Sequence, residues 1–140
     1  MTALAHVEPE HHFVEHGGEV EVELAAESEI GIFAAGLDAF AELVAGSDED
    51  GEPAEVQIEL PGRDRTLLLV DWLNELLFLA EVEQFIPRHI TSIERGDERL
   101  QATIAGCRGT PRPLVKGIAL NGLRFEQEGG VWHGRVVLDV

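Results

Sequence analysis

The chain has 140 residues, of which 44% are hydrophobic and 26% are charged. This length and composition predict one domain around one core, and the content of large apolar residues is too high for a disordered protein. The 27 acidic residues outnumber the 10 basic residues and give a formal net charge of -17. This charge argues against direct nucleic-acid binding, because phosphate backbones are usually bound by basic surfaces.

The negative charge allows two interpretations. It can keep the protein soluble, or it can attract and orient a basic partner, since complementary electric fields raise the rate of encounter. Charge alone favours the first interpretation, and both remain open at this point.

The sequence also indicates the compartment. It has no apolar run of the about twenty residues that a membrane-spanning helix needs, and its first five residues lack the basic flank of a secretion signal. Cys107 is the only cysteine, so no internal disulfide is expected. We therefore expect a cytoplasmic protein without a membrane partner.

The predicted elements begin after an N-terminal tail. Residues 1–12 show no apolar periodicity and are expected to be flexible, so the folded domain is predicted to span residues 13–140. Residues 19–24 alternate Glu with Val or Leu, which predicts a strand that buries one face. Ser28 is a suitable cap for a following helix whose apolar residues include positions 32, 33, 40, 43 and 44.

An acidic loop is predicted next. Residues 46–53 combine Gly, Ser and Pro with closely spaced carboxylates, as is typical of a solvated loop. The acidic residues suggest a calcium loop, but they do not have the alternate spacing of an EF-hand. Residues 55–60 alternate again and predict a second strand.

The most apolar segment, residues 64–83, is predicted to form a central helix that neighbours cover on most sides. Pro87 prevents this helix from continuing. Residues 90–105 and 120–140 each contain two apolar stretches around a turn signal, which predicts two hairpins. The order of elements predicts an α+β fold, a single domain with a mixed β-sheet of about six strands carrying two helices.

The serines, the cysteine and the glycines do not form any of the sequence motifs that are typical of catalytic or phosphate-binding sites. The serines and the cysteine do not lie in a strand-to-helix nucleophile motif, and the glycines do not form a phosphate-binding loop. His6, His11 and His12 belong to the predicted tail, where histidines are more often exposed than bound to metal. We therefore assign no catalytic residue and expect a protein that is not an enzyme.

Asp139 stands out near the end of the sequence. It follows apolar residues 136–138, and with the chain end at Val140 it would make an anionic group suited to a hard cation such as calcium. Taken alone, the pattern is more typical of an exposed chain end.

Four segments, in the same order and with the same gaps, resemble the archease family. FVEHGGEV at residues 13–20 is similar to the family's opening, which has an aromatic residue followed by Glu-His-Thr-Ala-Asp and an apolar residue. VDWLNELLFL at 70–79 is similar to its apolar-aromatic-Leu-x-Glu-Leu-Leu helix, and VKGIALN at 115–121 is similar to its Val-Lys-Ala-x-Thr-x-His segment. VVLDV at 136–140 is similar to its apolar-x-Asp-apolar ending.

The resemblance implies an accessory function. Archeases bind RtcB-type RNA ligases and promote the transfer of GMP from GTP to the ligase's active-site histidine, which sustains tRNA splicing and RNA repair. The resemblance also implies a cofactor, calcium or another divalent cation, held at the positions of Glu19, Asp139 and Val140. Further candidates for contacts beside this site or with the ligase are His16, Lys116 and Asn121.

Three departures from the family pattern mark a divergent member. Glu19 stands in place of Asp, Gly17 and Gly18 replace Thr and Ala, and Asn121 replaces His. Glu keeps a carboxylate but moves it by about one C–C bond, while Asn keeps a carbonyl oxygen and loses a titratable ring. The alternative function is therefore a metal-independent protein-interaction or chaperone-like module on the same fold.

Overall fold

The computed structural model describes residues 8–45 and 51–140. Within them the chain forms seven strands and two helices. The strands are β1 Glu10–His16, β2 Glu19–Ala26, β3 Glu52–Pro61, β4 Phe85–Arg95, β5 Arg99–Arg108, β6 Gly117–Glu128 and β7 Val131–Asp139. The helices are α1 Glu29–Val44 and α2 Arg65–Glu83.

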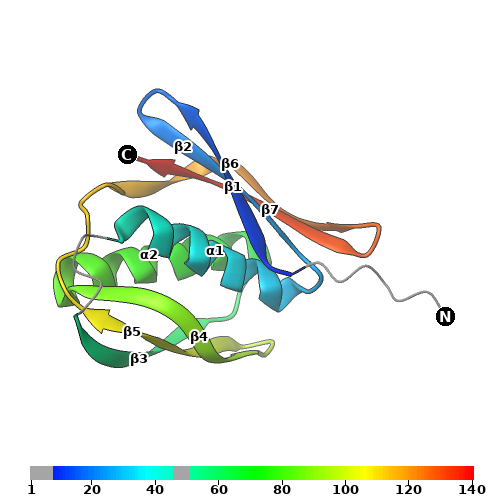
Figure 1. The fold of residues 1–140 in the computed structure, drawn as a ribbon. Helices are drawn as coiled ribbons and strands as arrows, with labels where there is room; N and C mark the ends of the chain where they lie inside the picture. The colour runs from blue at the N-terminus through cyan, green and yellow to red at the C-terminus, as the bar shows by residue number, and fades with distance from the viewer. Residues whose placement is uncertain (1–7, 46–50) are drawn as a thin grey trace.

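The elements form three layers, with both helices between two sheets (Figure 1). Sheet A has the strand order β1-β2-β7-β6, and sheet B has the order β3-β5-β4. Neighbouring strands run antiparallel in both sheets. Helix α1 contacts β2 and β4, and α2 contacts β6 and β4, so each helix packs against both sheets.

The helices are apolar around most of their circumference because they are covered on two sides. Phe33 in α1 and Trp72 in α2 are fully buried and pack edge to face, with ring centroids 5.9 Å apart. The indole N–H of Trp72 donates a hydrogen bond of 3.0 Å to the carbonyl oxygen of Phe33. Because a buried N–H without an acceptor is costly, this bond favours one arrangement of α2 against α1.

Each helix begins at a side-chain cap. The hydroxyl of Ser28 accepts a hydrogen bond of 3.0 Å from the N–H of Gly31, which confirms the predicted cap of α1. Asp64 accepts one of 2.8 Å from the N–H of Thr66 at the start of α2. That backbone hydrogen bond holds the pKa of Asp64 below its usual value. Helix α2 ends at Glu83, and the residue that caps it, Gln84, adopts a left-handed conformation with φ 54°, three residues before Pro87.

The predicted α+β class and the two helices are confirmed, but the predicted mixed sheet of about six strands is wrong in its arrangement. The described residues form two antiparallel sheets with seven strands in total. Helix α1 leads the chain from sheet A to sheet B. Strands that follow one another in the sequence, such as β2 and β3, therefore lie in different sheets on opposite sides of the helices. The strand predicted at 19–24 is correct, and its residues Val20, Val22 and Leu24 are buried.

Sheet A begins before the domain boundary predicted at residue 13. Strand β1 pairs with β2 along its whole length, from Glu10 opposite Ala25 to His16 opposite Glu19. It is an edge strand with a mixed burial pattern, which explains why the sequence shows no clear period there. Residues 1–7 and most of the predicted acidic loop, residues 46–50, lie outside the described residues, and residues 52 and 53 already belong to β3.

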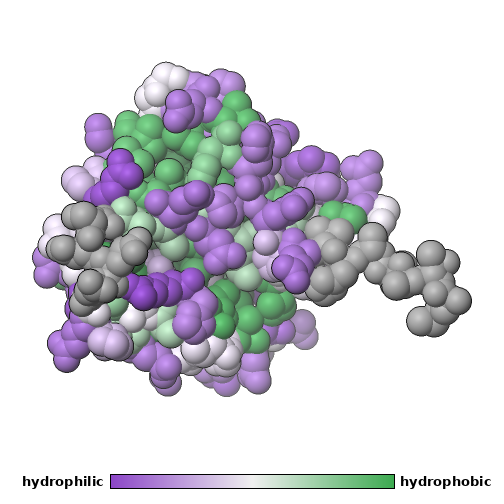
Figure 2. Space-filling view, viewed as in Figure 1, coloured by the Kyte–Doolittle hydropathy of each residue, from purple (hydrophilic) through white to green (hydrophobic). Residues whose placement is uncertain are grey.

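The face of the molecule seen in the view of Figure 1 is predominantly polar. Figure 2 shows hydrophilic side chains over much of the visible face, interrupted by smaller hydrophobic areas, one of them near the β1–β2 turn. In the part of the chain that the structure describes, no helix is long and apolar enough to cross a membrane.

Candidate functional site

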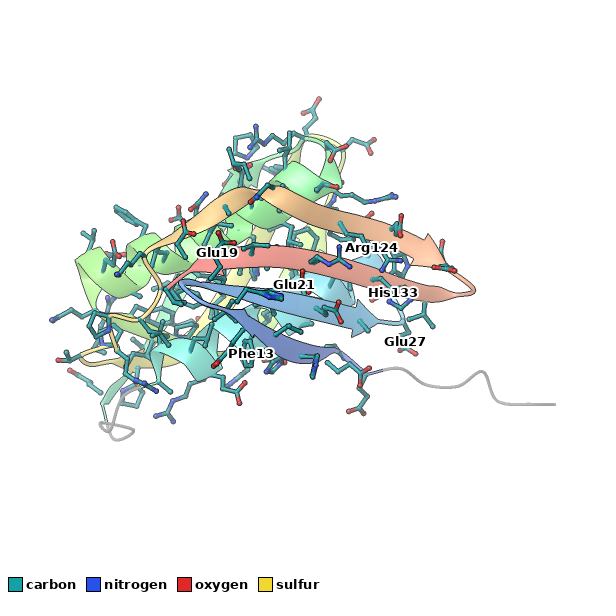
Figure 3. The ribbon with its side chains drawn as sticks, turned by 90° about the horizontal axis from the view of Figure 1, so that it is seen from above. Phe13, Glu19, Glu21, Glu27, Arg124 and His133 are labelled. Atoms are coloured by element: carbon teal, nitrogen blue, oxygen red, sulfur yellow. The ribbon has the colours of Figure 1, made fainter. Side chains whose placement is uncertain are left out.

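The outer face of sheet A, which points away from the helices, brings together residues from both ends of the chain. Glu19 on β2 lies directly opposite Asp139 on β7, and both residues are exposed, whereas their neighbours Val20 and Leu138 are buried. His16 on β1 lies opposite Glu19. One residue from each strand of sheet A thus lies in a row across the end of the sheet where β7 finishes: His16, Glu19, Asp139 and Gly117. Figure 3 shows Glu19 at this end.

The chain is firmly held around Asp139. The N–H of Lys116 donates a hydrogen bond of 2.7 Å to the carbonyl oxygen of Asp139, and the N–H of Val140 donates one of 3.0 Å to the carbonyl oxygen of Gly18. A Cβ atom added to Gly117 would lie 3.8 Å from Oδ2 of Asp139, which places this carboxylate beside Gly117 on the outer face. The segment is therefore part of the sheet and is not a frayed end.

The two carboxylates are not neutralised by the protein. Among the described residues, neither Glu19 nor Asp139 forms an ion pair, although several other carboxylates on the same face do. Directly opposed residues in antiparallel strands have Cα atoms about 4.5–5.5 Å apart, and like charges there repel one another. A cation bound between the two side chains would relieve this repulsion.

The predicted metal ligands Glu19, Asp139 and Val140 thus lie at one end of sheet A, and their oxygen atoms suit a hard cation. Two carboxylates and the main-chain oxygen of Val140 are fewer ligands than the about six to eight oxygen atoms that calcium prefers. No group of three or more His, Cys, Asp or Glu side chains in residues 8–45 and 51–140 has a metal-binding arrangement. The assignment of a metal therefore stays a prediction.

The other three candidates differ in their relation to this pair. His16 lies in the same row, next to Glu19. Lys116 is exposed, joins Asp139 through its backbone and is also one of the residues that line a cleft beside α1 and α2. Asn121 lies outside the row, in an irregular part of β6.

This irregular part, residues 120–123, folds over the outer face. It interrupts the pairing of β6 with β7 between Ala119 and Arg124. Gly122 has a φ of +73°, and a Cβ atom there would lie 3.3 Å from Cγ2 of Val137. Val137 points outward but is only 8% exposed, because the bulge lies close to it. Asn121 is exposed in the same bulge.

Sequence reasoning missed the ion pairs on the outer face. Arg135 on β7 lies 3.7 Å from both Glu21 and Glu23 on β2. Arg124 on β6 pairs with two acidic residues of its own strand, Glu126 and Glu128 (Figure 3 labels Glu21 and Arg124). The alternating glutamates of β2 are visible in the sequence, but the arginine that pairs with two of them, Arg135, lies near the other end of the chain.

His11 makes a structural contact that the sequence did not indicate. Its Nε2 atom lies 2.7 Å from Oε2 of Glu42, which ties β1 to α1. On the same helix, burial raises the pKa of the Asp38 carboxyl, and the nearby His11 partly opposes this effect. The histidine that was expected in a flexible tail is thus part of the β1–α1 interface.

Comparison with known proteins shows similarity over nearly the whole chain. A family model described as the Archease protein family (MTH1598/TM1083) matches residues 11–140. Protein archease of Methanosarcina mazei is 27% identical over 137 residues, covering 91% of this chain and 94% of that protein. Protein archease of Archaeoglobus fulgidus is 26% identical over 133 residues, covering 91% of this chain and 97% of that protein.

Solved structures show the same fold. The solution structure of Methanobacterium thermoautotrophicum protein 1598 has a TM-score of 0.72 at 24% identity, covering 93% of this chain and 98% of that one. The crystal structure of an archease from Thermotoga maritima, described as a possible chaperone, has a TM-score of 0.66 at 21% identity and covers 91% and 94% of the two chains.

Proposed function

Because this chain belongs to the archease family, we propose that it is a non-enzymatic accessory protein that activates an RtcB-type RNA ligase. In this role it promotes transfer of GMP from GTP to the ligase and sustains turnover in tRNA splicing or RNA repair in the cytoplasm. The description of the Thermotoga maritima relative as a possible chaperone agrees with an accessory role.

The observation that supports this proposal is the opposed pair Glu19 and Asp139, which has no ion-pair partner among the described residues. The pair and the main-chain oxygen of Val140 hold a divalent cation, for which calcium is the first candidate. These groups fill only part of a calcium coordination shell. The open positions are available to oxygen atoms of the partner or of its bound GTP, so the cation acts at the interface between the two proteins.

Charge supports a protein partner for this site. The net charge of -17 favours a basic surface on the partner, and a ligase that binds RNA and GTP carries such a surface. Complementary fields would orient the acidic end of sheet A toward the nucleotide site.

The test is a guanylylation assay of an RtcB-type ligase with GTP, in the presence and absence of this protein. We expect Asp139→Asn to fold normally and to abolish the stimulation, because the variant keeps the size of the side chain and loses its charge. Glu55→Gln, at an exposed position of β3 in sheet B, is the matched control and should stimulate like the parent. Full stimulation by Asp139→Asn would contradict the role of this site.

The alternative is a metal-independent interaction or chaperone-like module, and the small number of ligands at the site favours it. It predicts that the protein binds its partner equally well with calcium and with an excess of chelator. Co-sedimentation with the ligase under both conditions separates the two proposals, since the cation-bridged complex should dissociate when the cation is removed.

A further inference from the structure

A cleft of about 480 Å³ lies between the end of α1, the last turns of α2 and the segment before β6, whose Lys116 also joins Asp139 through its backbone. Its apolar lining includes Val44, Leu77, Ala80 and Val115. Its volume falls within the range of about 300–1,000 Å³ that is typical of ligand sites.

One wall of the cleft, residues 110–116, is held in place by main-chain hydrogen bonds. The N–H of Arg112 donates to the carbonyl oxygen of Val44 at 2.9 Å, and the N–H of Lys116 donates to that of Asp139 at 2.7 Å. Pro111 and Pro113 further restrict the backbone of this wall. The cleft is thus largely formed before any ligand arrives, which lowers the entropic cost of binding.

The cleft is locally cationic in a strongly acidic protein. Arg112 and Lys116 line it, with Glu81 as the one acidic residue in the lining. Neither cation forms an ion pair with a carboxylate among the described residues, whereas five other arginines do: Arg63, Arg95, Arg99, Arg124 and Arg135. Among the charged residues of the lining, cations therefore outnumber carboxylates by two to one.

Apolar side chains are also exposed on the neighbouring face of α2. Phe78 and Val82 are 50% and 63% exposed and lie four residues apart on one face, about 100° around the helix from Leu77 and Glu81. A ligand that covers both the cleft and these side chains must be extended, as a polypeptide segment is. Exposed aromatic residues beside a cleft are frequent anchors in protein recognition.

We propose that this cleft binds the carboxyl terminus of a partner polypeptide that ends in apolar residues. The terminal carboxylate pairs with Arg112 and Lys116, the last side chain packs against Leu77 and Ala80, and the preceding residues run along Phe78. Binding in this cleft needs no metal ion. The proposal is therefore independent of the function proposed for Glu19 and Asp139.

The test is fluorescence anisotropy with the full chain and a labelled peptide, Gly-Ser-Gly-Ala-Leu-Leu, with a free carboxyl terminus. We expect the same peptide with a terminal amide to bind at least about tenfold more weakly, because a charge-assisted pair is worth more than about 1.4 kcal/mol. Arg112→Gln/Lys116→Gln should weaken the free-acid peptide by a similar factor. Arg63→Gln/Arg99→Gln removes the same charge elsewhere and should leave its affinity within about twofold.

Two outcomes would overturn the proposal. Equal affinity of the acid and amide peptides would exclude recognition of the carboxylate, and binding of decanoate without binding of the peptide would assign a small amphiphile as ligand. An affinity that is unchanged by a calcium chelator would keep this site separate from the cation site.

Discussion

Glu19 and Asp139 lie directly opposite each other across the β2–β7 pair, although nearly the whole sequence separates them. Both carboxylates are exposed and neither forms an ion pair among the described residues. The first and last parts of the fold therefore have to pair in the correct register before the candidate cation site exists.

Calcium binding should depend on both members of this pair. In calorimetric titration of calcium into the metal-stripped protein, we expect Glu19→Gln and Asp139→Asn each to weaken binding by at least about tenfold, since each removes a charged ligand. Glu55→Gln is the control and should bind like the parent. A parent protein that does not bind calcium would remove the cation from the proposed mechanism and favour the metal-independent module.

Ser28→Ala should destabilise the protein by about 1 kcal/mol, because the hydroxyl of Ser28 satisfies the N–H of Gly31 at the start of α1. Urea denaturation followed by circular dichroism measures this change in the free energy of unfolding. Ser92→Ala, at an exposed position of β4, should change it by less than about 0.5 kcal/mol. Equal effects of the two substitutions would contradict the capping role.

Asp38→Asn should slightly stabilise the protein at neutral pH. Partial desolvation raises the pKa of Asp38 in the folded state although the residue is exposed, so folding favours the protonated carboxyl, and the small stability that it contributes is lost as the pH rises through the raised pKa. Asn stays neutral at every pH and avoids this loss. Melting temperatures of the two proteins should therefore differ at pH 7 and converge at acidic pH; the reverse trend would mean that the attraction between Asp38 and His11 dominates.

Gly106→Ala should be strongly destabilising. An added Cβ atom would lie 2.1 Å from the carbonyl oxygen of Ile86 on the neighbouring strand, and backbone atoms in a paired sheet cannot move away cheaply. We expect a loss of at least about 2 kcal/mol in the free energy of unfolding. Gly18→Ala, where nothing lies within 4 Å, is the matched control and should be close to neutral.

Much of the local structure was predictable because it depends on neighbours in the chain. The alternation at residues 19–24 fixed both the strand and its buried face, and Ser28 marked the start of α1. The four motif segments were enough to indicate the family that the comparisons then showed. Strand β1 was missed because an edge strand with polar and histidine side chains carries little periodic signal.

The tertiary structure decided what depends on residues far apart in sequence. Hydrophobic alternation does not specify a strand's partner, so only the packing of both helices between the strands shows two sheets where one was expected. The same holds for the sites. The sequence named Glu19 and Asp139, but their opposition comes from strand register. The cleft lined by Arg112 and Lys116 exists only because α1, α2 and the segment before β6 meet there.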